Sequence, residues 1–199
     1  MSNYLFFYFA LFSSVLPLSI GFLKRSNTRI RRVFFLLLLV RALTDIGSFV
    51  FEKVISNSFP IFHFSILIQF ALILELFFLI ESFKIPKSFF LLLGLVFFTL
   101  DLTVTSNIME NNHFSTMYTY TVISGFGINY LYNMKGDFFN RILFSSISLY
   151  TIAFTFLLFF EEIIFTTKEL IIILMNFMAL LSLALNFIFS YALCLKSKN

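Results

Sequence analysis

Charged side chains and cysteine are scarce in this chain, and tryptophan is absent. Charged residues make up 12% of its 199 positions, against roughly 25% in ordinary soluble domains. The single cysteine, Cys194, excludes an intramolecular disulfide and a metal site built on several cysteines. The hydrophobic share is 60% and the mean hydropathy is +0.97. This composition is typical of a membrane protein and gives no basis for redox chemistry on cysteine pairs.

Several catalytic and cofactor signatures are also missing from the sequence. It contains neither the H-E-x-x-H pattern of a metalloprotease nor a G-x-S-x-G serine turn. The last apolar stretch, 170–195, has no lysine that could hold a retinal. We therefore expect no catalytic residues, no metal and no cofactor. An enzyme that acts on lipid is the least favoured function class.

Seven apolar stretches run along the chain, each long enough to cross a hydrocarbon core of about 30 Å as a helix. The connections between them are too short to hold a soluble domain. The sequence predicts an all-α polytopic membrane protein, a seven-transmembrane-helix bundle that forms a single domain over residues 1–199. The expected helices are 3–23, 33–51, 60–82, 88–105, 114–133, 141–160 and 170–195.

The orientation follows from lysine and arginine, because positive residues in short loops are retained on the cytoplasmic side. Alternate connections carry only Lys53 and Lys168, and Arg41 falls inside a stretch. We expect the N-terminus outside, the C-terminus cytoplasmic and the first stretch kept as an anchor in a bacterial inner membrane. The basic residues of the other connections and the C-terminus are Lys24, Arg25, Arg29, Arg31, Arg32, Lys84, Lys87, Lys135, Arg141, Lys196 and Lys198.

The first cytoplasmic loop, Lys24 to Arg32, has five positive charges in nine residues. Such a segment suits anionic lipid headgroups, and it could also dock a cytoplasmic or membrane protein partner. Nothing in the sequence points to nucleic acid. On the outer side, a solvated rim is favoured over cation binding for the acidic residues Glu52, Glu110, Glu161, Glu162 and Glu169.

Charges inside the spans are the first candidates for a functional site, because an unpaired charge in the membrane is costly. Counted from the cytoplasmic ends, Arg41 and Glu75 lie roughly 10 to 12 Å deep. We expect them to form a salt bridge, with Asp45 one turn above Arg41 and Gln69 close to the depth of Asp45. This polar cluster would be a ligand site or a proton and ion relay; structural pairing of the helices is an equal alternative.

A second expected pair, His63 and Asp101, lies about one turn below the outer interface. A histidine beside a carboxylate would titrate near neutral pH and could sense external acidity or serve in hydrolysis. The favoured alternative is that both side chains reach interfacial water. A metal site is not expected, because a third ligand is missing.

The stretch 114–133 is the most polar, and it brings Tyr120 and Ser124 to helical spacing. Together with Tyr150 and Asn176 these side chains would line a pocket for a small molecule. The alternative for each hydroxyl is a hydrogen bond to its own helix backbone.

Three features together resemble a group of small seven-span membrane proteins of AT-rich Gram-negative bacteria. They are Thr44 followed by Asp45, the segment IFHF at 61–64, and Glu75. The resemblance implies the seven-span topology alone and carries over no activity.

The expected function is an inner-membrane sensory or signalling module. It would bind a small ligand or sense the membrane, and relay the signal to a separate partner protein. An ion-coupled transporter or carrier and an accessory subunit of a larger membrane complex are the alternatives.

Overall fold

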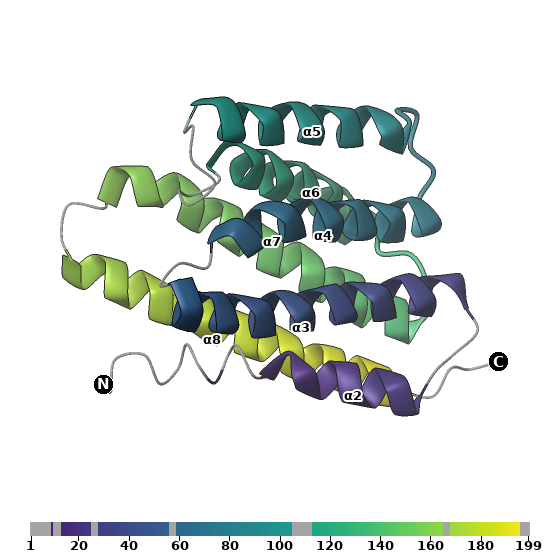
Figure 1. The fold of residues 1–199 in the computed structure, drawn as a ribbon. Coiled ribbons are helices and arrows are strands. Elements are labelled where there is room, and N and C mark those ends of the chain that lie inside the picture. The colour runs from purple at the N-terminus through teal and green to yellow at the C-terminus, as the bar shows by residue number, and fades with distance from the viewer. Residues whose placement is uncertain are drawn as a thin grey trace. The chain divides into compact units, whose positions relative to one another are not determined.

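A computed structural model of the chain describes residue 9 and residues 13–24, 28–55, 59–104, 113–164 and 168–195. These residues form seven helices and no strand, which confirms the all-α prediction (Figure 1). Several positions of the first expected helix, 3–8 and 10–12, lie outside the described residues, as do Arg25, Glu110, Lys196 and Lys198. The helices are α2 Val15–Leu23, α3 Arg29–Ile55, α4 Phe59–Ile80, α5 Lys87–Val104, α6 His113–Asn133, α7 Phe138–Ile164 and α8 Lys168–Cys194.

Among the described residues, five helices are long and apolar enough to cross a membrane: α3, α4, α5, α7 and α8. The described part of α2 has nine residues, which is short for a span. Helix α6 has 21 residues, but tyrosine, serine, threonine and asparagine recur along it and lower its hydropathy. The chain therefore has the helices of a membrane protein, and the count of seven spans remains a prediction.

The chain divides into two compact units. The first unit joins Met1–Lys24 to Ser124–Asn199, and the second unit is Arg25–Ile123. The boundary falls within α6, so its two halves belong to different units.

In the second unit, each helix runs opposite to the one before it, in the order α3, α4, α5 and the first half of α6. Arg29 meets Glu75 at one end of α3 and Gly47 meets Ile61 near the other, so α3 and α4 are antiparallel. A methyl group on Gly47 would come within 2.6 Å of Ile61 Cδ1, which shows how closely the two helices approach. The core between the helices of this unit is apolar and fully shielded; it includes Phe34, Leu38, Phe70, Leu74 and Phe77.

In the first unit, the second half of α6 packs against α7, and α8 contacts both α7 and α2. Ser124 Oγ lies 2.8 Å from Thr155 Oγ1, which joins α6 to α7. Asn186 meets Ser13 before the start of α2, and Lys24 meets Cys194 at its end. Because both pairs advance together along the chain, α2 and α8 run parallel.

Residues in the connections explain where several helices end and begin. Pro86 precedes α5, and the residue before a proline is held away from helical geometry, so α4 cannot continue through this segment. Gly136 adopts φ +98 after α6, a conformation that glycine adopts without strain. Asp137 then accepts a hydrogen bond from the Asn140 N–H at 2.8 Å and caps the start of α7.

Candidate functional site

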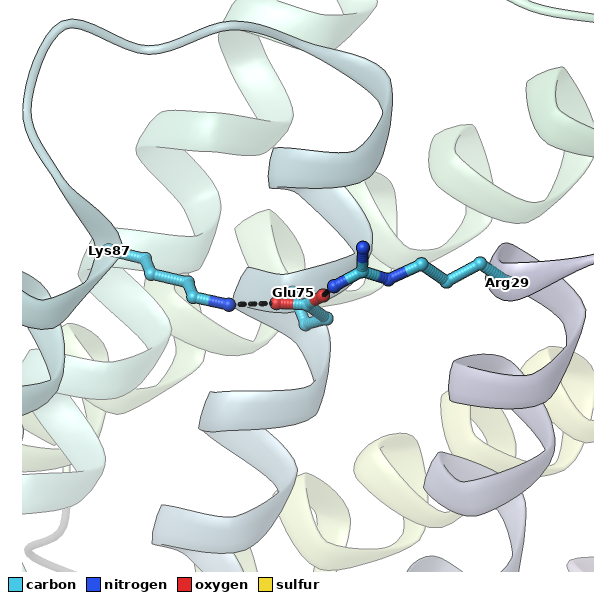
Figure 2. Close-up of polar contacts among 3 residues, drawn as sticks. All are labelled: Arg29, Glu75 and Lys87. Atoms are coloured by element: carbon cyan, nitrogen blue, oxygen red, sulfur yellow. Dashed lines mark hydrogen bonds and ion pairs between the residues drawn. The ribbon is translucent and has the colours of Figure 1, made fainter.

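The candidate site is an ion-paired group in the second unit, Arg29, Glu75 and Lys87, hereafter the Glu75 cluster. Arg29 Nη2 lies 2.7 Å from Glu75 Oε1, and Lys87 Nζ bonds the other carboxylate oxygen. Figure 2 shows the two cations reaching Glu75 from opposite sides. The carboxylate thus links the first residues of α3 and α5 to α4, where it stands one turn before the helix ends.

The cluster carries a net positive charge and differs in exposure among its members. The side chain of Glu75 is 18% exposed, whereas those of Arg29 and Lys87 are 72% and 48% exposed. Arg29 uses one of its five N–H donors for the carboxylate in the ion pair shown. A competing anion could therefore approach both cations without entering the core.

Glu75 does not have the ion-pair partner expected from the sequence, Arg41. Its partners are Arg29 and Lys87, and Arg41 is not among them in the described chain. The expected salt bridge to Arg41 is therefore corrected. Helix α3 begins at Arg29, four residues before the predicted start, and it is this first residue of α3 that reaches Glu75.

The other members of the expected polar cluster lie higher on the same two helices. Arg41 and Asp45 are partly buried and one turn apart on α3. Gln69 Nε2 reaches Thr44 Oγ1 at 3.5 Å, so the amide of α4 stands beside the residue that precedes Asp45. The structure thus brings Gln69 to the level of Asp45 as expected, while Glu75 belongs to a separate group. Their roles in ligand binding or relay stay predictions.

An apolar groove of about 490 Å³ runs between α3 and α4, hereafter the α3–α4 groove. Two hydroxyls lie in its wall, but Thr44 Oγ1 donates to Val40 O and Ser65 Oγ donates to Phe62 O. The groove therefore offers mainly shape and apolar surface, and both hydroxyl protons are already used. Its lining is Val40, Leu43, Thr44, Phe51, Ile61, Phe64, Ser65 and Ile68.

His63 and Asp101 are both fully buried, at 0% exposure, so neither reaches interfacial water. The His63 ring stands edge-on to Phe98, 6.4 Å between ring centroids and one turn before Asp101. The carboxylate of Asp101 accepts hydrogen bonds from the backbone N–H groups of Phe114 and Ser115, each at 2.8 Å. Asp101 therefore caps the start of α6, where the helix dipole also favours a negative charge.

The expected pocket residues fall into different units. Tyr120 belongs to the second unit, and Ser124, Tyr150 and Asn176 belong to the first. Within the first unit, Tyr150 Oη lies 3.2 Å from Ser182 Oγ and joins α7 to α8. Ser124 and Tyr150 therefore serve contacts between neighbouring helices, Asn176 is partly buried on α8, and the shared pocket stays a prediction.

Sequence reasoning placed Arg29 and Lys87 in loops and missed their contact with Glu75. A signal was present, because Glu75 is close to the end of its helix and long basic side chains can bend along a helix to meet such a charge. Within the described residues, no three His, Cys, Asp or Glu side chains gather to hold a metal ion. The chemistry available at the Glu75 cluster is the binding of an anion.

Comparisons of the chain with family models, with curated proteins and with solved structures give no match in any of the three. The class of the protein therefore rests on its own features. They define an all-helical protein with five helices long and apolar enough to cross a membrane, with a group of ion-paired residues in one of its two units.

Proposed function

We propose that this chain is a membrane-embedded sensory or signalling module that responds to an anion at the Glu75 cluster and relays the change to a separate partner protein. The observation that carries the proposal is the double ion pair of Glu75. One carboxylate holds the first residues of two helices, and both of its cations are open to solvent. An anion that competes for Arg29 and Lys87 would loosen both helix starts at once.

The proposed output surface is the start of α3 and the basic loop that precedes it. Arg29, Arg31 and Arg32 follow one another closely there, and Arg32 is exposed. When Glu75 releases Arg29, the position of this charged segment changes relative to α4. A partner with an acidic surface would detect such a change, because binding between charged surfaces depends on their relative placement.

The proposed topology has seven spans in a bacterial inner membrane, with the N-terminus outside and the C-terminus cytoplasmic. Two contacts support it, each within one unit. Lys24 Nζ lies 3.4 Å from Cys194 O, and Arg29 and Lys87 share Glu75. Each contact brings together basic segments that the positive-inside rule assigns to the same side. The parallel course of α2 and α8 agrees with an odd number of spans.

The exposed Cys194 allows a direct test of this topology. A membrane-impermeant maleimide added to intact cells should leave Cys194 unlabelled and should label it after the membrane is opened. In the matched control, Cys194→Ser with Val104→Cys moves the thiol to the far end of α5. That variant should be labelled in intact cells, and the reverse pattern for the two proteins would reject the orientation.

The signalling proposal is tested by the distance between the starts of α3 and α5. Spin labels at Thr28→Cys and Ser88→Cys, in a Cys194→Ser background, would report this distance in vesicles. We expect one narrow distribution for the parent protein and a broader one with Glu75→Gln. Glu52→Gln is the matched control, because Glu52 is an exposed carboxylate at the other end of α3. Identical distributions with and without Glu75→Gln would reject the proposal.

A further inference from the structure

We infer that the second unit binds one anionic phospholipid. Its phosphate would lie between Arg29 and Lys87, and an acyl chain would occupy the α3–α4 groove. The inference rests on the proposed function, since it names the ligand of the same cluster. It also joins that cluster to a groove that the proposed function does not use.

The Glu75 cluster and the groove lie on the same stripe of α3. Arg29 and Val40 are eleven residues apart, which is three helical turns and a rotation of only about 20°. Thr44 and Phe51 continue the stripe along the groove. A molecule held by Arg29 can therefore follow the surface of α3 into the groove without crossing to another face.

The same relationship holds on α4. Glu75 and Ile68 are seven residues apart, two turns with a rotation of about 20°, and Ile61 and Ser65 carry the stripe farther. Because α3 and α4 are antiparallel, the end of the α3 stripe that holds Arg29 lies beside the end of the α4 stripe that holds Glu75. The seam between the helices thus has a charged end and an apolar end.

The dimensions fit a phospholipid. On α4, the lining residues Ile68 and Ile61 are about 10 and 21 Å along the helix axis from Glu75, a range that includes half of a hydrocarbon core, about 15 Å. A lipid with its phosphate at the Glu75 cluster therefore brings its chains to the level of the groove. The groove volume of about 490 Å³ lies in the range of sites that hold small ligands.

The chemistry also selects this occupant. Both hydroxyls in the groove wall donate their proton to a carbonyl of their own helix, so neither has a proton left to donate to a polar ligand. Leu43, Phe64 and Ile68 are 59%, 56% and 50% exposed on helices apolar enough to span a membrane, which opens the groove toward lipid. At the other end, two exposed cations share one carboxylate and retain a net positive charge for a phosphate.

Competition between Glu75 and the phosphate predicts the direction in which Glu75→Gln changes the affinity for lipid. The carboxylate and the phosphate would bind the same two cations, so removing the carboxylate charge should strengthen lipid binding. A basic side chain near a membrane surface contributes about fivefold to the binding of an anionic lipid. We therefore expect Glu75→Gln to raise the affinity by about that factor, and Arg29→Gln or Lys87→Gln to lower it similarly.

Native mass spectrometry of the full chain in detergent measures the bound lipid directly. The probes are long-chain phosphatidylglycerol, long-chain phosphatidylcholine, dihexanoyl phosphatidylglycerol and inorganic phosphate. We expect one long-chain phosphatidylglycerol per protein, with weaker binding of the other three. Equal binding of phosphatidylcholine would overturn the role of the cations, and equal binding of the short-chain lipid or free phosphate would overturn the role of the groove.

Two substitutions fill the groove from its exposed rim, Leu43→Trp and Ile68→Trp. Each should lower the bound fraction of long-chain phosphatidylglycerol, whereas the control Ile46→Trp should not, because Ile46 is exposed on α3 but does not line the groove. Thermal unfolding confirms that each variant is folded. If Ile46→Trp and the groove variants lose lipid equally, the groove is not the binding site.

The two proposals can fail separately. Selective lipid binding without any change in the distance between spin labels at positions 28 and 88 would reject the signalling role and leave the lipid site. A distance that responds to Glu75→Gln, in a protein that binds none of the four probes selectively, would reject the lipid site and leave the signalling role.

Discussion

Asp101 of α5 and Ser115 of α6 are joined by a hydrogen bond, in which the Ser115 N–H donates to Asp101 Oδ2 at 2.8 Å. Both residues are fully buried. The other carboxylate oxygen accepts from Phe114, so one side chain of α5 satisfies two of the unpaired N–H groups that begin every helix. This contact fixes where α6 starts relative to α5.

Asp101→Ala should therefore destabilise the protein by about 2 kcal/mol, since it removes the cap and leaves two buried donors without their acceptor. Asp101→Asn should cost less, because one oxygen remains. Thermal unfolding in detergent measures both. Thr99→Ala is the control, because Thr99 is exposed on α5 and its hydroxyl bonds to Leu95 O; a loss as large as that of Asp101→Ala would contradict the assignment.

Glu75 should couple energetically to Arg29 and not to Arg41. In a double-mutant cycle, Glu75→Gln and Arg29→Gln should interact by about 0.5 kcal/mol, a value typical of an exposed ion pair. Glu75→Gln and Arg41→Gln should be additive, since the ion-pair partners of Glu75 are Arg29 and Lys87. Coupling of Glu75 to Arg41 that equals its coupling to Arg29 would contradict the ion pairs described above.

Two glycines of α6 should respond in opposite directions to alanine. A methyl group on Gly127 would lie 2.8 Å from Ser148 Cβ, whereas one on Gly125 would meet nothing within 4 Å. Gly125→Ala should raise the unfolding temperature, because alanine favours a helix over glycine by up to about 1 kcal/mol. Gly127→Ala should lower it, because α7 must move to make room. The same sign for both would show that α6 and α7 do not approach closely at Gly127.

The hydroxyl and the ring of Tyr118 should each contribute to the free energy of unfolding. The hydroxyl donates to Phe90 O at 2.8 Å, and the ring stacks on Phe97 with 4.8 Å between centroids. Tyr118→Phe should cost about 1 kcal/mol through the lost hydrogen bond, and Tyr118→Leu about 1 kcal/mol more through the lost stacking. Tyr132→Phe, at a residue 89% exposed, is the matched control and should leave the unfolding temperature unchanged.

Ser13→Ala should destabilise the first unit more than Asn186→Leu does. Asn186 Nδ2 donates to Ser13 Oγ at 2.7 Å, and Asn186 is almost fully buried. Removing Ser13 Oγ leaves that donor buried, whereas leucine removes the polar group altogether. Unfolding temperatures of the two variants give the order, and the reverse order would show that the bond is not what holds Asn186 in place. Ser19→Ala, at an exposed serine bonded to Val15 O, serves as the control.

The helices could be predicted because their apolar lengths are set by the membrane, and each of the seven expected ranges overlaps an observed helix. Their ends were less predictable. The first turn of α3 consists of three arginines and one isoleucine, and such a sequence is equally typical of a charged loop. Because α3 begins earlier than expected, Arg29 of its first turn, and not Arg41, meets the carboxylate of Glu75.

The role of Asp101 could not be predicted for a different reason. The carboxylate and the N–H groups that it binds are separated by a connection with no distinctive spacing, and only the packing of α6 against α5 brings them together. Likewise, Gln69 was expected at the level of Asp45 from its position along the helix, but its contact with Thr44 depends on how the two helices are rotated.

The parallel contact of α2 and α8 has a consequence for the order of assembly. The first unit is made from the two ends of the chain, whereas the second unit is one continuous segment. During synthesis, α3, α4, α5 and the start of α6 emerge together and can pack as soon as Ile123 is available. Helix α2 is made before all of them, yet its partner α8 is made after them. Helix α2 therefore remains without this partner while α3 to α7 are made, and Ser13, just before α2, meets Asn186 only once α8 is present.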